Sequence, residues 1–119
     1  MRSPVPGIVA LLALSLSATA AAQSGFTVTH KIGTTTPDQV EVVGMVVNDT
    51  RAEAVDVSVT VEALNPSGKV IARGVCFVTD RLRGGSSADF SAKVPVVAGT
   101  SKYRARVSSY RFIQSVQTP

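Results

Sequence analysis

The sequence contains no tryptophan, one cysteine and one histidine. A single cysteine excludes an intramolecular disulfide, so a folded domain must be held together by its core alone. Metal sites need several convergent ligands, and we therefore expect no metal site and an ordinary strand position for His30. Free cysteine is among the most buried residue types, which favours a small buried apolar role for Cys76. An intermolecular disulfide is the alternative that an odd cysteine permits.

Recognisable patterns of catalysis are also missing. The eight acidic residues are scattered, and no serine stands in a GxSxG or SxxK context. Residues 84–87, GGSS, are rich in glycine but lack the lysine and the following helix of a phosphate-binding loop. We therefore predict a protein that is not an enzyme, with no catalytic, cofactor-binding or metal-binding residues and no cofactor.

The first apolar stretch, residues 7–16, is too short to cross a bilayer, which takes about 20 apolar residues. Arg2 precedes this stretch, and Ala20 and Ala22 supply an A-x-A cleavage pattern after it. These features predict a signal peptide cleaved near Ala22 and a periplasmic or secreted mature chain, with a bacterial periplasm preferred. No later apolar run is long enough for a membrane helix. The predicted parts are a signal peptide over 1–22, a folded domain over 23–113 and a frayed tail over 114–119.

Valines at 55, 57, 59 and 61 alternate with polar residues in the segment AVDVSVTVEAL, residues 54–64. This period of two fits no helix face and predicts one strand of an antiparallel sheet, with valines facing a core and polar residues facing water. Residues 48–53, NDTRAE, are expected to form a hairpin turn before this strand, and Asn65 begins an NPSG turn after it.

Five further strands are predicted, at 26–31, 39–48, 69–79, 88–94 and 103–113, and the first, fourth and fifth of them show a similar alternation. The second of the five is apolar at both parities, so we expect cover on both of its faces for part of its length. Gly44 predicts a bulge or a close backbone approach, and Gly74 predicts that the two halves of its strand join different sheets. Six or seven short strands joined by turn-rich loops indicate an all-β fold, a single antiparallel β-sandwich.

Four segments carry a resemblance to a known family. They are residues 43–48, VGMVVN, residues 63–70, ALNPSGKV, residues 82–90, and residues 103–107, YRARV. These segments and the valine strand resemble the FxLYD family of bacterial exported domains, which implies an immunoglobulin-like sandwich with an accessory binding or structural role and no reaction. Water-stress and late-embryogenesis-abundant type 2 sandwiches share the paired valine strands.

The chain departs from the FxLYD pattern at four positions. Val61 replaces a Phe, Leu64 a Tyr, Asn65 an Asp and Gly84 a Pro. The positions that match carry turn and core chemistry, so the resemblance is specific for the fold and weak for function.

The formal net charge is +4, and arginines gather in the C-terminal half. Arg104 and Arg106 share one strand face by the period of two, and Arg81 and Arg83 precede them in sequence. These four arginines are either a solvated face that protects a sheet edge or a patch for an anionic partner. We expect no nucleic-acid partner, because export removes it and no aromatic residues interleave the basic ones.

The function class that these patterns favour is a small non-enzymatic binding or structural module of the bacterial envelope. Its partner would be another envelope protein or an anionic surface. Two alternatives are a stress-protective sandwich that shields proteins or membranes, and an accessory subunit of a secreted enzyme.

Overall fold

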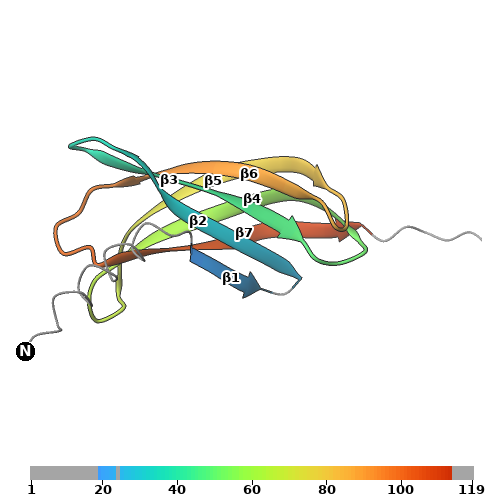
Figure 1. Ribbon diagram of the computed structural model, residues 1–119, viewed down its shortest axis with the longest axis horizontal. Coiled ribbons are helices and arrows are strands. Elements are labelled where there is room, and N and C mark those ends of the chain that lie inside the picture. Colours follow the sequence, from blue (N-terminus) through green and yellow to red (C-terminus); the bar gives the residue numbers. More distant parts are fainter. Residues whose placement is uncertain (1–18, 24, 114–119) are drawn as a thin grey trace, which may run out of the picture.

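The computed structural model describes residues 19–23 and 25–113, and these residues form an all-β sandwich (Figure 1). This confirms the predicted fold class. The strands are β1 (Thr19–Gln23), β2 (Phe26–Thr35), β3 (Gln39–Asn48), β4 (Glu53–Leu64), β5 (Val70–Leu82), β6 (Ser87–Pro95) and β7 (Lys102–Ile113). The described residues contain no apolar helix long enough to cross a membrane. Strand β1 lies at the end of the predicted signal peptide, and the other six lie in the predicted domain.

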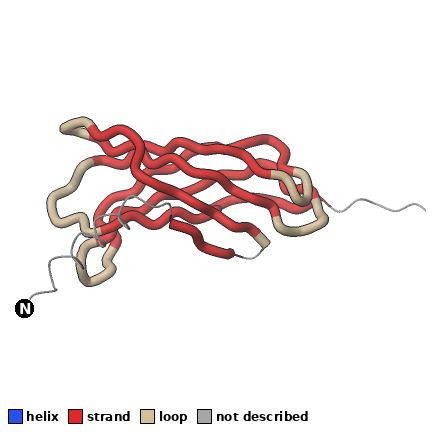
Figure 2. The backbone as a smooth tube through the Cα atoms, viewed as in Figure 1, coloured by secondary structure: helices blue, strands red, loops and turns tan. Residues whose placement is uncertain are grey.

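The strands form two antiparallel sheets. One sheet has four strands in the order β1-β2-β3-β6, and the other has three in the order β5-β4-β7. Figure 2 shows the connecting loops at the two ends of the sandwich, so the sheet faces are free of loops along most of their length. A site on this domain therefore lies on an outer sheet face, along a sheet edge or at a loop end.

The core is built mainly from valine, as the alternation predicts. Val57, Val59 and Val61 of β4 have no exposed surface and face valines and small residues of the opposite sheet. Burying each valine side chain contributes about 1.5–3 kcal/mol before conformational entropy is subtracted. Phe26 closes one end of this core by packing against Tyr110 and stacking on Phe112, at centroid distances of 4.8 and 5.7 Å.

A bulge in β4 corrects the predicted alternation. Asp56 has a positive φ of 53°, and the pairing of β4 with β5 shifts between Val57 and Ser58. The extra residue places Ala54 and Val57 in the core cluster, while Val55 is buried outside it. The prediction that Val55 shares the core face with Val57 is therefore wrong. An inserted residue reverses the side-chain parity on one side of a bulge.

The segment between β3 and β4 does not form the expected hairpin, because these two strands belong to different sheets. It is a crossover organised by Asn48, whose buried Nδ2 donates to the carbonyl oxygens of Ala52 and Leu82 at 2.8 and 2.9 Å. Its Oδ1 accepts hydrogen bonds from the backbone and hydroxyl of Thr50. By contrast, the turn at Asn65 does join two paired strands, β4 and β5.

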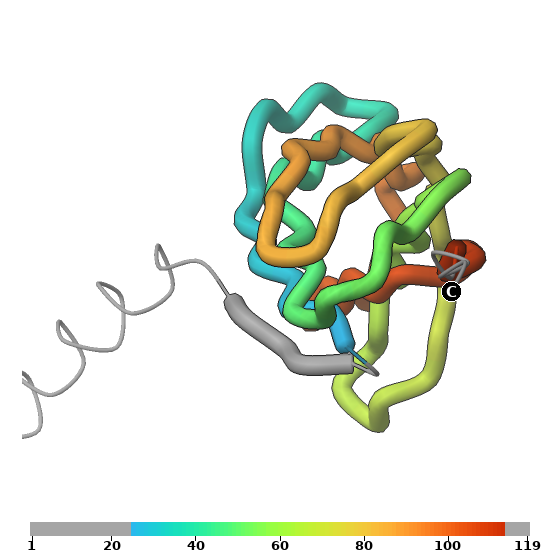
Figure 3. The backbone as a smooth tube through the Cα atoms, turned by 90° about the vertical axis from the view of Figure 1, so that its right-hand side faces the viewer, coloured from blue at the N-terminus to red at the C-terminus, as the bar shows by residue number. Residues whose placement is uncertain are grey.

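Gly44 and Gly74 lie where a neighbouring strand's backbone comes very close to the chain. A Cβ on Gly44 would collide with the Thr29 carbonyl oxygen, while the β3–β6 pairing continues through it without a bulge. Strand β5 stays paired with β4 on both sides of Gly74, so the prediction of two sheets sharing this strand is wrong. A Cβ on Gly74 would collide with the Lys93 carbonyl oxygen, because β5 lies against β6 here. This contact closes one side of the sandwich, which Figure 3 shows end-on.

Candidate functional site

The outer face of the three-stranded sheet carries a buried acid. Glu62 lies on the central strand β4, directly opposite Arg73 of β5 on one side and Arg104 of β7 on the other. Its exposed fraction is 3%, although the alternation predicts a side chain in water. Directly opposite residues in paired strands point to the same face, so the register brings one carboxylate and two guanidinium groups together.

Three arginines surround the Glu62 carboxylate. The Nε and Nη2 atoms of Arg104 donate to Oε1 at 3.0 and 2.7 Å. Nη2 of Arg106 lies 3.5 Å from Oε2, and Nη2 of Arg73 lies 3.8 Å from it. The arginine side chains remain 46–61% exposed, so they cover the acid while facing solvent themselves. Three positive charges and one negative charge leave this cluster at +2.

Two opposing effects act on the pKa of Glu62. Burial acts to raise it, and the hydrogen bonds from Arg104 and then Arg106 outweigh burial and hold the pKa below its ordinary value. The carboxylate is therefore ionised at neutral pH. A fixed negative charge at the centre of the face orients the guanidinium groups around it.

Exposed apolar side chains lie beside the arginines. Val75 and Phe77 of β5 are 65% and 58% exposed, more than the other exposed large apolar residues in the described ranges. They stand opposite Thr60 and Ser58 of β4, and thus on the same side of the sheet as Glu62. We define the arginine face as Glu62, Arg73, Val75, Phe77, Arg104 and Arg106. Arginine and aromatic residues are enriched in the buried parts of protein interfaces.

The structure brings together only two of the four arginines singled out from the sequence. Arg104 and Arg106 both lie on the arginine face. Arg81 is paired with Val55, seven residues along β4 from Glu62, which is roughly 23 Å at about 3.3 Å per residue. Its Nε lies 3.4 Å from Oε2 of Glu53. Arg83 is exposed in the loop after β5.

Sequence reasoning missed Glu62, Arg73, Val75 and Phe77. The alternation of Arg73, Val75 and Phe77 with smaller residues was a usable signal that they share one face. What brings that face against Glu62 is the register of β4 with both of its neighbours, and the alternation in one strand does not specify it.

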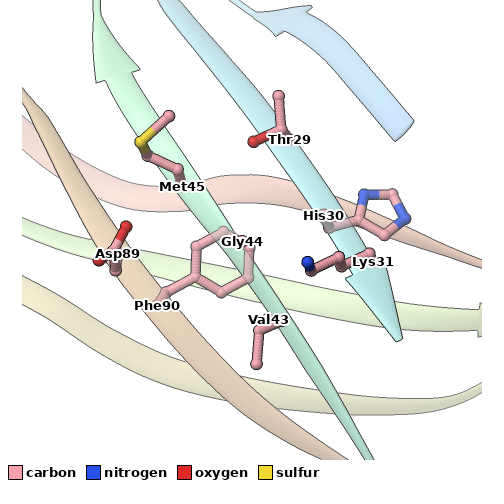
Figure 4. A pocket seen from close by; sticks show the side chains of 8 residues that line it. All are labelled: Thr29, His30, Lys31, Val43, Gly44, Met45, Asp89 and Phe90. Atoms are coloured by element: carbon pink, nitrogen blue, oxygen red, sulfur yellow. The ribbon is translucent and has the colours of Figure 1, made fainter. Parts of the chain in front are cut away.

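A second candidate site is an open hollow of about 500 Å³ on the outer face of the four-stranded sheet (Figure 4). Val43 and Met45 line it between Thr29 and Lys31 of β2 and Asp89 of β6. Met45 is 36% exposed, so the outer face of β3 is open to solvent at this position. One lysine and one aspartate around an apolar strip show no convergence of polar groups of the kind that fixes a small ligand.

His30 faces the sandwich interior, where its Nε2 lies 3.2 Å from the Tyr103 carbonyl oxygen on the opposite sheet. Burial lowers its pKa, and this hydrogen bond partly opposes the effect. Cys76 is half-buried against the core, and burial raises the pKa of its thiol. A raised pKa gives a thiol with little thiolate character. Among residues 19–23 and 25–113, no three His, Cys, Asp or Glu side chains form a group suited to a metal ion.

Comparison with known proteins adds no relative. No protein-family model, curated protein or solved structure matches this chain. The resemblance to the FxLYD family stays a prediction based on the residues quoted above.

Proposed function

We propose that this chain is an exported, non-enzymatic module of the bacterial envelope that binds an acidic segment of a partner protein through the arginine face. The observation that carries the proposal is the arrangement of Arg73, Arg104 and Arg106 around buried Glu62, next to exposed Val75 and Phe77. The signal-peptide pattern supports export. The resemblance to FxLYD domains supports an accessory role without a reaction.

The arginines keep donors available for a partner. Each guanidinium group has five N–H donors, and a carboxylate accepts two of them in a planar fork. Arg73 and Arg106 approach Glu62 only at 3.8 and 3.5 Å, and their side chains are 61% and 46% exposed. With a net charge of +2 on the cluster, one or two carboxylates of a partner would be attracted to these free donors.

The apolar residues favour a protein over a lipid surface as the partner. Binding energy in protein interfaces concentrates in arginine and aromatic residues that become desolvated at the centre of the contact. Phe77 and Val75 supply such a centre on the outer sheet face, with arginines to one side. The arginines are oriented by Glu62, and this fixed geometry suits carboxylates that are themselves held in place by a folded or strand-like partner. A fluid anionic lipid layer needs only net positive charge.

The test uses two matched double variants. Phe77→Ser with Arg73→Gln changes the arginine face without touching the short Arg104–Glu62 hydrogen bonds, whereas Met45→Ser with Arg83→Gln makes the same kinds of change elsewhere. The processed protein is cross-linked in isolated envelopes, captured proteins are identified by mass spectrometry, and affinity is measured with the purified partner. We expect the arginine-face variant to bind at least about tenfold more weakly and the control variant to bind like the wild type.

Two results would overturn the proposal. One is equal affinity of both double variants for the captured protein. The other is binding of the wild type to anionic phospholipid vesicles, lost in the arginine-face variant, with no protein captured. The second result would make the face a lipid-binding surface.

A further inference from the structure

The outer edge of β2 is covered by one short strand. Strand β1 pairs with β2 in antiparallel register, from Gln23 opposite Phe26 to Thr19 opposite His30. Figure 1 shows β1 at this edge of the four-stranded sheet. The other edge of β2 is paired with β3. The backbone groups of residues 26–30 that point away from β3 therefore depend on β1 for their hydrogen bonds.

Removal of the predicted signal peptide would uncover this edge. Cleavage near Ala22 removes Thr19–Ala22, four of the five residues of β1, and leaves only Gln23. Strand β2 then becomes the outermost strand of its sheet. Unpaired N–H and C=O groups in such a strand form a template for pairing with another chain.

Residues 26–30 themselves lack the usual protection of a sheet edge, and the nearest charged groups are Lys31, the next residue of β2, and Asp49, which accepts a hydrogen bond from the Thr27 hydroxyl at 2.6 Å. Residues 26–30, FTVTH, include no lysine, arginine, aspartate, glutamate or proline. Their pairing with β3 is regular, and the irregularity in this ladder comes later, between Ile32 and Thr35. On the opposite side of the sandwich, β5 lies against β6 at Gly74 and closes the gap between the sheets.

We propose that the processed protein forms a twofold dimer in which β2 of one copy pairs antiparallel with β2 of a second copy, centred on Val28. The covered span is residues 26–30, and Val28 is its middle residue. In this register Thr27 lies opposite Thr29 of the other copy, and Phe26 lies opposite His30. The result is a continuous sheet of six strands made of β2, β3 and β6 from both copies.

In the self-paired sheet, inward-facing residues of one copy meet inward-facing residues of the other, and the same holds for the outer face. Phe26, Val28 and His30 are buried toward the sandwich interior, while Thr27 and Thr29 are half-buried on the outer face. An antiparallel pair centred on Val28 matches inward residues with inward residues and threonine with threonine. Threonine pairs across an antiparallel ladder are favourable, and a self-complementary patch is what a twofold interface requires. These properties favour a second copy over an unrelated strand.

The inference rests on the export part of the proposed function, because only cleavage exposes the edge. The precursor is exported with its own signal peptide from a bacterial host, and intact mass gives the N-terminus of the purified product. Analytical ultracentrifugation then measures the dissociation constant. We expect a dimer, and Thr29→Lys should weaken it by about tenfold or more, since lysine on an edge opposes pairing. Ser87→Lys, at an exposed position of β6 in the same sheet, is the matched control and should have no effect.

Cross-linking tests the register in a Cys76→Ser background. A mixture of Thr27→Cys and Thr29→Cys proteins should oxidise to a disulfide-linked pair, and each protein alone should cross-link far less, because position 27 faces position 29. A monomer whose mass shows cleavage near Ala22 overturns the dimer, and a monomer that keeps Thr19–Gln23 overturns the cleavage on which the dimer depends. A dimer that tolerates Thr29→Lys and forms no mixed disulfide also overturns it. The mass measurement separates this failure from a failure of export.

Discussion

Replacing Glu62 by glutamine tests whether the acid is an ionised group held by arginines. Glutamine keeps the size of the side chain and one carbonyl oxygen for Arg104, but it removes the negative charge. The hydrogen bonds at 2.7 and 3.0 Å then become neutral-acceptor bonds, and the guanidinium groups of Arg73 and Arg106 lose the charge that attracts them.

The expected loss follows from the two contacts of Arg104. Hydrogen bonds to charged groups contribute about 1.5–3 kcal/mol each, but the arginines are about half exposed and water screens the interaction. We expect Glu62→Gln to lower the free energy of unfolding by about 1–2 kcal/mol at pH 7. Arg104→Met should cost more, about 2–3 kcal/mol, because it leaves a buried carboxylate with contacts of only 3.5 and 3.8 Å.

The assay is urea denaturation of the wild type, Glu62→Gln, Arg104→Met and the double variant. The double variant should resemble Glu62→Gln, so the coupling energy should equal the cost of Arg104→Met alone, about 2–3 kcal/mol. Because the pKa of Glu62 is lowered in the folded state, its contribution is complete above the ordinary glutamate pKa of about 4.3. It is lost as pH falls through the folded pKa, so the difference between wild type and Glu62→Gln should disappear in acid. Coupling below about 0.5 kcal/mol, together with parallel pH profiles, would refute the reasoning.

Three further predictions concern the interior. Gly44→Ala should cost about 1–3 kcal/mol or prevent folding because its Cβ meets backbone, whereas Gly33→Ala meets only movable side-chain atoms and should be nearly neutral by urea denaturation. Val59→Ala should lower the free energy of unfolding by about 2–3 kcal/mol, and Val55→Ala by roughly half of that, because Val59 lies in the core cluster and Val55 does not. Equal losses in urea denaturation would contradict the bulge. The pKa of His30 in the folded protein should lie below the ordinary histidine value of about 6.5, and the neutral ring should carry its proton on Nε2. The free energy of unfolding should therefore fall as pH drops below about 6.5. A folded-state titration midpoint above about 6.5, measured by NMR, would contradict this.

Much of the fold was predictable because side-chain alternation reports burial directly. Ala88, Phe90, Ala92 and Val94 alternate with polar residues in the sequence, and Phe90, Ala92 and Val94 are buried in the structure. Such a strand has one apolar face, and a register shift would expose all of it. Local alternation therefore determined where the strands lie and which face most of them bury.

Sheet membership was not predictable in the same way. A crossover and a tight hairpin both need a residue whose side chain hydrogen-bonds to the backbone of the turn, as Asn48 does. Residues 48–53 therefore predict a turn, but they do not indicate which sheet the next strand joins. Asp56 likewise gives no local warning of its positive φ. The bulge becomes evident only when β4 is aligned with both β5 and β7, where the register shifts.

The candidate site was predictable only where the pattern of a single strand was enough. Arg104 and Arg106 share a face by the period of two, and that part of the reasoning needs one strand only. Glu62 is buried because the side chains of three strands meet above it, and neither its identity nor its neighbours in sequence indicate this. A polar residue at an outward position is expected to be exposed to water. The burial of Glu62 becomes evident only from the register of β4 with β5 and β7.

The energetics of Glu62 bear on why it lies on the outer face at all. A buried ion pair is often no more stabilising than apolar side chains of the same size, because desolvation offsets most of the attraction. Phe77 and Val75 show that this sheet face already accepts apolar residues, so stability alone gives no reason for an acid between them and β7. An ionised carboxylate does something that an apolar residue does not, which is to hold guanidinium groups in a fixed orientation. If that is its role, Glu62→Gln should weaken binding of the acidic partner at pH 7 even at temperatures where the variant is fully folded, and Arg83→Gln should not.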